Sequence, residues 1–306
     1  MTAACATESS TVPPPTRVLL TSGLPGAGFY PLGVGLAQGY TRLSNGQLQV
    51  DVHESPGSVR NVQAVERGDA DVGLAFADVA YMAYVGRLAE EPTPFQRLRG
   101  IAVLQLTPLH LLVRPAAGIV RIEDLRGRRV GTGPPGSGTA LTSQLLMRAF
   151  GILPEETIAE TLPFNEAAKR LVAGTLDAAF INGDYPADSV TIAARTGAKL
   201  LAVEGENVTR LRREYPFLRL TFIPGGTYPA HAEHVPTIGV DTLLVCRADL
   251  EEHIAYRLTQ ALFEVLPQLS AERTVLRSID IERAPATPIP LHRGAARYYR
   301  ERELTR

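Results

Sequence analysis

From residue 17 onward, apolar and polar positions follow the spacing of strands and helices in alternation. Residues 17–22 form a short apolar run, and residues 48–52 alternate apolar and polar as a half-buried strand does. Between them, apolar residues recur at helical spacing over residues 29–43. A second helix is predicted over residues 58–68, with a Ser near its start and a Gly at its end, and a buried strand over residues 70–78. This alternation predicts an α/β fold with a mostly parallel sheet flanked by helices.

The second half of the chain repeats the plan of the first. Residues 23–28 and 133–138 both read Gly-x-Pro-Gly-x-Gly, and each set follows a predicted strand and opens a predicted helix. Further along, a Gly that ends a helix and two Asp that bracket an apolar strand recur in the same order, as Gly68, Asp71 and Asp78 and then as Gly174, Asp177 and Asp184. The repeat predicts two lobes built on one plan.

Two apolar segments, at residues 101–115 and 237–250, are predicted to join the lobes. If the chain crosses near residue 112 and returns near residue 243, two crossover strands form a hinge beside a cleft. An amphipathic helix is predicted from Leu250 to Leu266. The predicted division is residues 1–16 as a disordered tether or signal remnant, residues 17–111 plus 244–306 as lobe 1, and residues 112–243 as lobe 2.

Composition and charge exclude several classes of protein. The chain has 306 residues, 45% hydrophobic and 21% charged, which is a globular balance. A net charge of −1 leaves no basic excess for a phosphate backbone, so no nucleic-acid partner is expected. The longest apolar run, residues 101–113, is interrupted by Gln105, Thr107, Pro108 and His110 and is shorter than the roughly 18 residues of a membrane span.

The first 16 residues have no apolar periodicity and end in three prolines, so they are expected to be extended. Ala3 and Ala4 before Cys5 resemble the end of a lipoprotein signal whose apolar core is missing. Either the signal has been removed or the segment is a plain tail. Cys246 lies in an apolar run, and no disulfide between it and Cys5 is expected.

The two glycine loops are the strongest candidates for a binding site. A strand–Gly-turn–helix junction directs free backbone N–H groups and the positive end of a helix at whatever lies above it. Ser137 and Thr139 add hydroxyls on one side, and Ser58 adds one on the first lobe. We therefore expect a small anion to be held between the loops. Removal of the Ser137 hydroxyl is expected to weaken binding and to leave folding nearly unchanged.

Two other functions stay open at this point. Residues 131–136 read Gly-x-Gly-x-x-Gly, which a nucleotide- or NAD-binding enzyme would have, although Pro134 and Pro135 remove N–H donors from the loop. His231 and His234 could hold a metal, but a solvated loop between Pro229 and Pro236 is the interpretation that their spacing favours. No catalytic residue, metal or cofactor is expected.

Several motifs, in order, give the chain a resemblance to a known family. They are "GAGFYPLG", "GSVRNVQAVERGDADVGLAFADVAYMAY", "DLRGRRVGTGPPGSGT", "GTLDAAFINGDYPA", "IPGGTYPAHAEHVPTIGV" and "PLHRGAARYYRE". From about Arg17 to Arg302, the sequence resembles the TAXI family, the TRAP-associated extracytoplasmic immunogenic solute-binding proteins. The resemblance implies a two-lobed periplasmic-binding-protein fold and a periplasmic or extracytoplasmic monomer, lipid-anchored through Cys5 if a signal precedes it. It also implies delivery of a small organic acid or amino acid, of the glutamate or 2-oxoglutarate class, to the membrane subunits of a TRAP transporter.

The same resemblance implies a set of ligand-binding residues. They are Gly28, Phe29, Tyr30, Ser58, Val59, Asn61, Asp78, Tyr81, Ser137, Gly138, Thr139, Asp184, Tyr185 and Tyr228. The chain departs from the family pattern at two places. Arg60 stands where a polar or acidic residue is expected, and Asp184 stands where a second Gly is common. Both departures are expected to bear on which ligand is held.

Overall fold

A computed structural model describes residues 14–24, 28–229, 231–272 and 282–304. Cys5 and most of the predicted tether lie outside these residues, so the predictions about them stay predictions. Within the described parts, none of the helices has the length and apolar character needed to cross a membrane.

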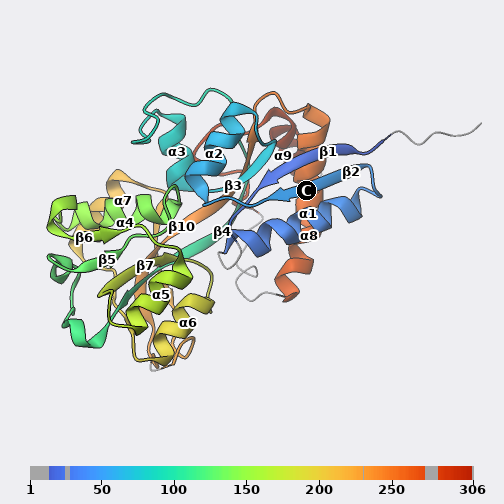
Figure 1. The fold of residues 1–306 in the computed structure, drawn as a ribbon. Helices are drawn as coiled ribbons and strands as arrows, with labels where there is room; N and C mark the ends of the chain where they lie inside the picture. Colours follow the sequence, from blue (N-terminus) through green and yellow to red (C-terminus); the bar gives the residue numbers. More distant parts are fainter. Residues whose placement is uncertain (1–13, 25–27, 230, 273–281, 305–306) are drawn as a thin grey trace, which may run out of the picture.

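The first lobe is built on three parallel strands, in the order β2-β1-β3 (Figure 1). They are β1 (Thr16–Thr21), β2 (Leu48–His53) and β3 (Val72–Phe76), connected by helices α1 (Phe29–Leu43) and α2 (Ser58–Arg67). Helix α3 (Ala77–Tyr84) follows β3 directly. Helix α2 ends where the sequence predicts, because Gly68 adopts the left-handed conformation (φ 83°) that closes a helix.

The second lobe repeats this arrangement with β6-β5-β7, again in parallel. Its parallel strands are β5 (Arg129–Gly131), β6 (Ile158–Glu160) and β7 (Ala178–Asn182), and its first two helices are α4 (Gly138–Ala149) and α5 (Phe164–Val172). The remaining elements are α6 (Asp188–Arg195), β8 (Lys199–Leu200), α7 (Glu206–Glu214) and β9 (Leu218–Ile223), with short 3₁₀ turns at Pro115–Ala117, Ile122–Leu125 and Pro154–Glu156.

Two long strands, β4 (Leu98–Val113) and β10 (Val235–Arg247), run through both lobes and pair with each other (Figure 1). Their pairings with the other strands are antiparallel: β10 pairs with β9 and then with β3, and β4 pairs with β10 and then with β7 and β8. The predicted crossing points at residues 112 and 243 fall within β4 and β10, and the exact lobe boundaries remain a prediction. The two-lobed α/β architecture predicted from the sequence is confirmed.

The C-terminal segment returns to the first lobe. Helix α8 (Glu252–Glu272) extends past the predicted end at Leu266 and packs on α1, and α9 (Arg293–Leu304) packs on α8. The Tyr299 hydroxyl donates to the carbonyl of Ile101 at 3.0 Å, which ties α9 to β4.

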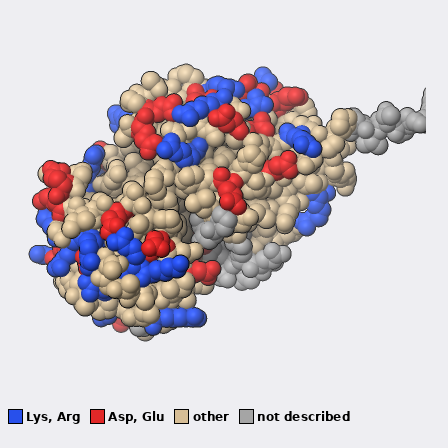
Figure 2. Space-filling model, viewed as in Figure 1, with Lys and Arg blue, Asp and Glu red and all other residues tan. Residues whose placement is uncertain are grey.

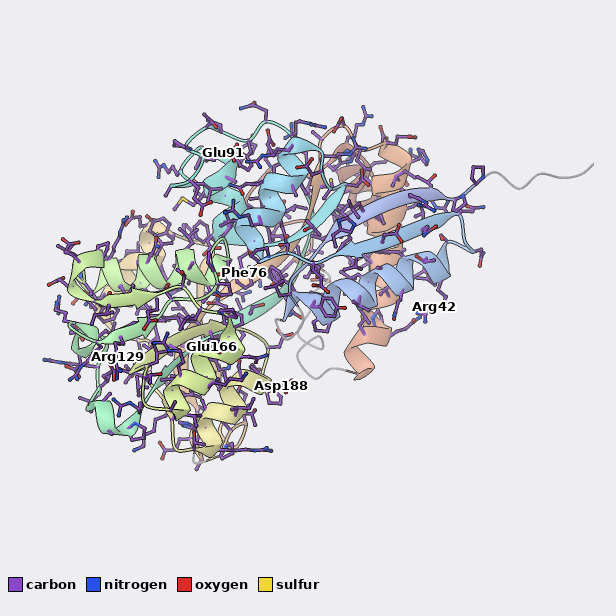
Figure 3. All side chains as sticks on the ribbon, viewed as in Figure 1. Arg42, Phe76, Glu91, Arg129, Glu166 and Asp188 are labelled. Carbon is purple, nitrogen blue, oxygen red and sulfur yellow. The ribbon has the colours of Figure 1, made fainter. Side chains whose placement is uncertain are left out.

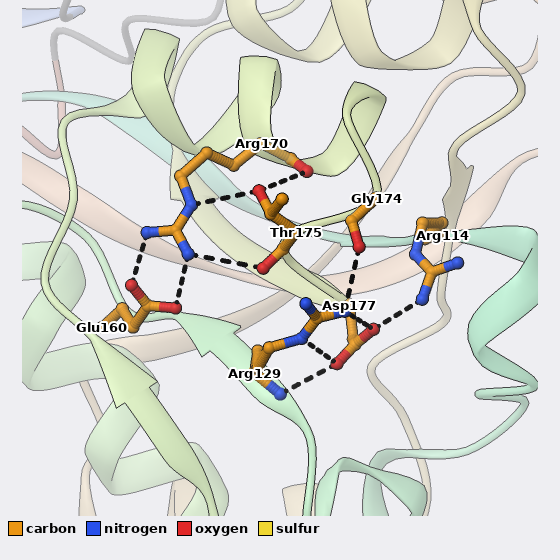
Figure 4. Close-up of polar contacts among 7 residues, drawn as sticks. All are labelled: Arg114, Arg129, Glu160, Arg170, Gly174, Thr175 and Asp177. Carbon is orange, nitrogen blue, oxygen red and sulfur yellow. Dashed lines mark hydrogen bonds and ion pairs between the residues drawn. The ribbon is translucent and has the colours of Figure 1, made fainter.

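The aspartates of the repeat make equivalent contacts in the two lobes. Asp71 accepts from the amide of Leu19 in β1 (2.8 Å) and from Arg247 Nε at the end of β10 (2.9 Å). In the second lobe, Asp177 accepts from the amide of Arg129 in β5 (3.1 Å) and from Arg114 Nη2 after β4 (2.7 Å) (Figure 4). In each lobe, therefore, one carboxylate joins the first strand to a long shared strand.

The Asp177 carboxylate is held by more than one guanidinium. Arg129 Nε and Nη2 donate to it at 3.0 and 2.8 Å, in addition to Arg114. The Arg129 hydrogen bonds, reinforced by Arg114, hold the pKa of Asp177 well below its usual range. Beside it, Arg170 Nη2 donates to Glu160 Oε1 at 2.9 Å and so links α5 to the end of β6 (Figure 4).

Candidate ligand-binding site

A small cavity of about 40 Å³ lies where the two lobes meet. A single water needs roughly 10–15 Å³ of such volume, so the cavity has room for a handful of non-hydrogen atoms. Its walls come from the glycine loops, from β3, β4 and β7, and from the starts of α2, α4 and α5. The lining residues are Gly23, Gly28, Phe29, Pro56, Gly57, Ser58, Phe76, Gln105, Thr107, Ser137, Gly138, Thr139, Phe164, Asn182, Gly183 and Asp184.

The start of α4 forms one wall, and its Ser137 hydroxyl is already engaged in the loop. Ser137 is the N-cap of α4: its Oγ accepts from the amide of Ala140 at 3.2 Å and donates to the carbonyl of Pro134 at 2.7 Å. This finding changes the expectation that removing the hydroxyl leaves folding unaffected, because an N-cap stabilises its helix. Thr139, by contrast, lines the cavity, and its hydroxyl makes no hydrogen bond to another residue in the described parts of the chain.

The first turn of α2 lies directly against the second glycine loop. The amides of Val59 and Arg60 donate to the carbonyl of Gly136 at 3.1 and 3.4 Å. Gly57 adopts a φ of 134°, and a Cβ there would lie 3.4 Å from Ser137 Cα. These contacts join α2 of the first lobe to the loop of the second, so the lobes touch beside the cavity.

Phe76 and Gly138 pack closely against each other where the lobes meet. Phe76 ends β3 and lies at the junction of the lobes in Figure 3. A Cβ at Gly138 would overlap Phe76 Cδ2 and lie 2.9 Å from Ser58 Oγ. A larger residue at 138 would therefore require Phe76, Ser58 or the lobes themselves to shift.

Asp78 and Thr142 form a second contact between the lobes. The Thr142 hydroxyl, in α4, donates to Asp78 Oδ2, in α3, at 2.9 Å. Asp78 is fully buried and also accepts from the amide of Val79 at 2.7 Å. Burial raises the pKa of the Asp78 carboxyl to about 6, although the hydrogen bond from Thr142 acts in the opposite direction.

Polar side chains from β4 and from the end of β7 form another part of the cavity wall. Gln105 Nε2, in β4, donates to Asp184 Oδ1, after β7, at 2.7 Å. Gln105 Oε1 and both amide atoms of Asn182 are buried without a hydrogen-bond partner among the described residues. The Thr107 hydroxyl is paired with that of Thr242 in β10 at 2.8 Å.

The structure brings half of the predicted residues to the cavity wall. Those that line it are Gly28, Phe29, Ser58, Ser137, Gly138, Thr139 and Asp184. Those that lie elsewhere are Tyr30, Val59, Asn61, Asp78, Tyr81, Tyr185 and Tyr228. A role in ligand binding stays a prediction for all of them, although the second group does not line this cavity.

Two residues of the second group, Asn61 and Tyr228, make hydrogen bonds within the fold. The Asn61 amide nitrogen donates to the carbonyls of Ser22 and Leu74 at 2.6 Å and so fixes α2 on the sheet. The Tyr228 hydroxyl accepts from the amide of Ala187 and lies 2.9 Å from His110 Nε2. Burial lowers the pKa of His110 to about 4, so the imidazole is neutral and accepts from Tyr228.

The other residues of this group lie in separate surroundings. Tyr30 faces a groove between α1 and α8, and Tyr81 packs at 5.6 Å from the ring of Phe217. Tyr185 packs on the smaller hydrophobic core of the second lobe. Arg60 bonds Gln63 and Glu90, and its aliphatic stem lies against Gly136 rather than in the cavity.

The sequence-based prediction missed lining residues that are far apart along the chain: Gly23, Pro56, Gly57, Phe76, Gln105, Thr107, Phe164, Asn182 and Gly183. Gln105 and Thr107 did leave a signal, since they interrupt the apolar run of β4. A polar side chain in a strand that is otherwise buried needs a hydrogen-bond partner, and here the cavity lies beside it.

The described residues include no group of His, Cys, Asp or Glu arranged to hold a metal ion. His231 Nε2 accepts from the amide of Leu200 at 3.2 Å, and His234 Nδ1 accepts from the amide of Gly225 at 3.0 Å. Both imidazoles thus bond the backbone of their own lobe.

The surface beside the cavity is weakly charged. On the face in Figure 2, Lys and Arg gather on the second lobe, and the hollow between the lobes is largely uncharged where it is described.

Comparisons with known proteins agree with this architecture. A model of the NMT1-like family matches residues 20–302. MatC from Rhodopseudomonas palustris, solved with bound malate, is 16% identical, with 95% of this chain and 98% of that chain covered and a TM-score of 0.60. The periplasmic binding protein BugD is 12% identical, with 95% and 94% covered and a TM-score of 0.60. The alkanesulfonate-binding protein SsuA from Xanthomonas axonopodis pv. citri, bound to MOPS, is 14% identical, with 94% and 84% covered and a TM-score of 0.54. At these identities the likeness shows the fold, which is that of periplasmic binding proteins.

Proposed function

Because the chain belongs to the NMT1-like family, we propose that it is an extracytoplasmic solute-binding protein that captures a small organic acid or amino acid between its lobes. The names of similar folds support the proposal, since MatC was solved with malate and BugD is a periplasmic binding protein. The function is one of binding and delivery and not of catalysis.

The observation that carries the proposal is the position of the cavity. Its walls come from both lobes, and it is bordered by direct contacts such as Val59 to Gly136 and Phe76 to Gly138. A ligand that touches both walls favours the state in which the lobes meet, because it binds that state more tightly than the open one. The paired strands β4 and β10 are the hinge in this proposal.

The start of α4 supports the choice of an acid as ligand. The first-turn amides of Gly138 and Thr139 have no acceptor within their helix, and the positive end of the helix favours a carboxylate. The Thr139 hydroxyl adds a donor on the same wall. Small carboxylates of the glutamate or 2-oxoglutarate class are the starting candidates that the resemblance to TAXI proteins offers.

The resemblance also supports the finer parts of the proposal. The protein would act in the periplasm or outside the cell as a monomer and hand its ligand to the membrane subunits of a TRAP-type transporter. It would be lipid-anchored through Cys5 if a signal precedes that residue.

A thermal-shift screen of the purified chain tests the proposed function. The panel contains amino acids, hydroxy and oxo acids, dicarboxylates, alkanesulfonates, and NAD with other nucleotides. We expect at least one acid to raise the melting temperature with concentration, since a ligand at 100 times its Kd adds about 2.7 kcal/mol. The Gly138→Val variant is the matched control, because it cannot bring the lobes together, and it should lose the shift. A response to nucleotides alone would overturn the proposal and favour an α/β enzyme.

A further inference from the structure

The charge of the cavity wall constrains what the cavity can hold. Among the described residues that line it, Asp184 is the one with an ionisable carboxylate, and none is Lys, Arg or His. A ligand with two carboxylates would bring two negative charges to a wall that already carries one. Like charges at such short range are unfavourable, more so in a cavity that excludes water.

Asp184 is part of a group of acceptors supplied by β4 and by the end of β7. Gln105 Nε2 donates to Asp184 Oδ1 at 2.7 Å, which leaves Gln105 Oε1 as an acceptor. That oxygen and both amide atoms of Asn182, its oxygen and its nitrogen, have no partner in the described parts of the chain. Both side chains are only 4% exposed and line the cavity. Buried amides without partners are rare in folded proteins, so a ligand that donates hydrogen bonds here accounts for them.

Two parts of the cavity wall are therefore chemically different. At the start of α1, a Cβ on Gly28 would lie 4.0 Å from the amide nitrogen of Asp184, so the acidic residue is beside that helix. The start of α4 instead offers the amides of Gly138 and Thr139 and the Thr139 hydroxyl, which donate. The start of α4 is suited to a carboxylate, and the part lined by Asp184, Gln105 and Asn182 to a group that carries N–H donors and positive charge.

We propose that Asp184, with Gln105 and Asn182, selects a ligand whose carboxylate is accompanied by an ammonium group, which is a small α-amino acid. The inference rests on the proposed function and narrows its ligand. The carboxylate contacts the start of α4, and the ammonium donates to Asp184 and to the amide oxygens of Gln105 and Asn182. The volume of about 40 Å³ favours the smaller members of this class. Asp184 is the specificity-determining residue, and the amides position the donor group.

Calorimetric titration of matched ligands tests this selection without any mutation. Alanine, lactate and pyruvate have nearly the same size and one carboxylate, but alanine alone has the ammonium; aspartate and malate form a second pair. We expect alanine to bind the parent about 10- to 150-fold more tightly than lactate or pyruvate, the range that corresponds to one hydrogen bond with a charged group. The same order should hold for aspartate over malate.

Two variants test whether Asp184 causes the preference for alanine over lactate. Asp184→Asn should weaken alanine binding about 10- to 150-fold and change lactate binding less than about 3-fold. The matched control, Asp188→Asn, removes the same charge from an exposed position at the start of α6 that does not line the cavity, and should bind like the parent. If Asp184→Asn fails to fold, Asn182→Ala should show the same preferential loss of alanine.

Two results would overturn the inference. One is a parent that binds lactate, pyruvate or malate as tightly as the matching amino acid, which would leave the proposed solute-binding function standing. The other is an Asp184→Asn variant that keeps the full preference for alanine over lactate. The proposed function fails separately, when nucleotides are the one class on the screening panel that binds.

Discussion

Ser137 and Thr139 lie two residues apart at the start of α4, yet their hydroxyls have different surroundings. The Ser137 Oγ is bonded within its own loop, to Ala140 and Pro134. Thr139 lines the cavity, and its hydroxyl has no hydrogen-bond partner among the described residues. Position in the sequence does not separate these roles, because both residues lie in one Gly-Ser-Gly-Thr motif. The structure assigns a folding role to the first hydroxyl and leaves the second available to a ligand.

The first prediction separates these two roles. Ser137→Ala should lower the free energy of unfolding by about 1 kcal/mol, because α4 loses its N-cap. Thr139→Val keeps the shape of the side chain and should leave stability nearly unchanged, while lowering affinity for the acid found in the screen about 2- to 12-fold. Urea unfolding and calorimetric titration of both variants measure the two quantities. Equal stability of the Ser137→Ala variant and the parent would show that the cap contributes little.

At the scale of elements, one carboxylate holds together the strands of each lobe. Asp177 joins β5 to the segment after β4 through Arg129 and Arg114, and Asp71 has the corresponding place in the first lobe. Both follow a helix that ends at a left-handed Gly. The repeat that the sequence shows is therefore a repeat of structural contacts.

The second prediction concerns Asp177. Its folded-state pKa lies below its unfolded value of about 3.9, so its contribution is present above pH 4 and is lost as pH falls further. Asp177→Asn should cost about 2 kcal/mol at pH 7, and the difference from the parent should shrink at pH 3 and below. Urea unfolding across this range measures it. Glu155→Gln, an exposed charge in the same lobe, is the control and should unfold like the parent. A deficit that is equal at pH 7 and pH 3 would contradict the role of the ionised carboxylate.

The third prediction concerns Asp78, whose pKa is shifted in the opposite direction to that of Asp177. Its folded-state pKa of about 6 lies above the unfolded value, so the folded state binds a proton more readily between pH 4 and 6. Stability from this residue is greatest below pH 4 and is lost as pH rises through about 6. Asp78→Asn should remove this dependence and raise stability at pH 8 by up to about 3 kcal/mol.

In Asp78→Asn, the new side-chain amide can form hydrogen bonds with the same neighbours. Thr142 can accept from the new amide, because its own proton can go to the carbonyl of Gly138, 3.0 Å away. Asp69→Asn, at an exposed position before β3, is the matched control and should follow the pH profile of the parent. Thermal unfolding between pH 4 and 8 measures all three proteins. An Asp78→Asn variant less stable than the parent at pH 8 would show that the buried charge is favourable.

At the scale of the whole molecule, the sequence predicted the architecture better than it predicted the site. Strand and helix periodicity, with the Gly-x-Pro-Gly-x-Gly loops, predicted two α/β lobes and the starts of α1 and α4. These features depend on residues close together in the chain. The two crossing strands were also visible, because β4 and β10 are long apolar runs.

The site depends on contacts that no local pattern contains. A ligand-binding role for Asn61 stays a prediction; its amide bonds the carbonyls of Ser22 and Leu74, which only the folded sheet brings together. Asn182 and Gln105 were missed because they come from different strands, β7 and β4, and meet only at the cavity. Side chains that line a cavity between lobes are fixed by how the lobes meet, and the spacing of residues does not encode that.

Closure of the lobes on a bound acid is the central claim, and Gly138 is the residue that controls it. In the closed arrangement its backbone lies against Phe76 and Ser58, with no room for a Cβ. Gly138→Val should keep both lobes folded and hold them apart, because the substituted side chain would fill the contact.

Small-angle X-ray scattering of the parent and Gly138→Val, each with and without a saturating acid from the screen, tests the claim most directly. We predict that the radius of gyration of the parent falls when the acid binds, while that of Gly138→Val stays at the value of the unliganded, open protein. A parent whose radius of gyration is unchanged, although titration shows the site to be full, would contradict the account.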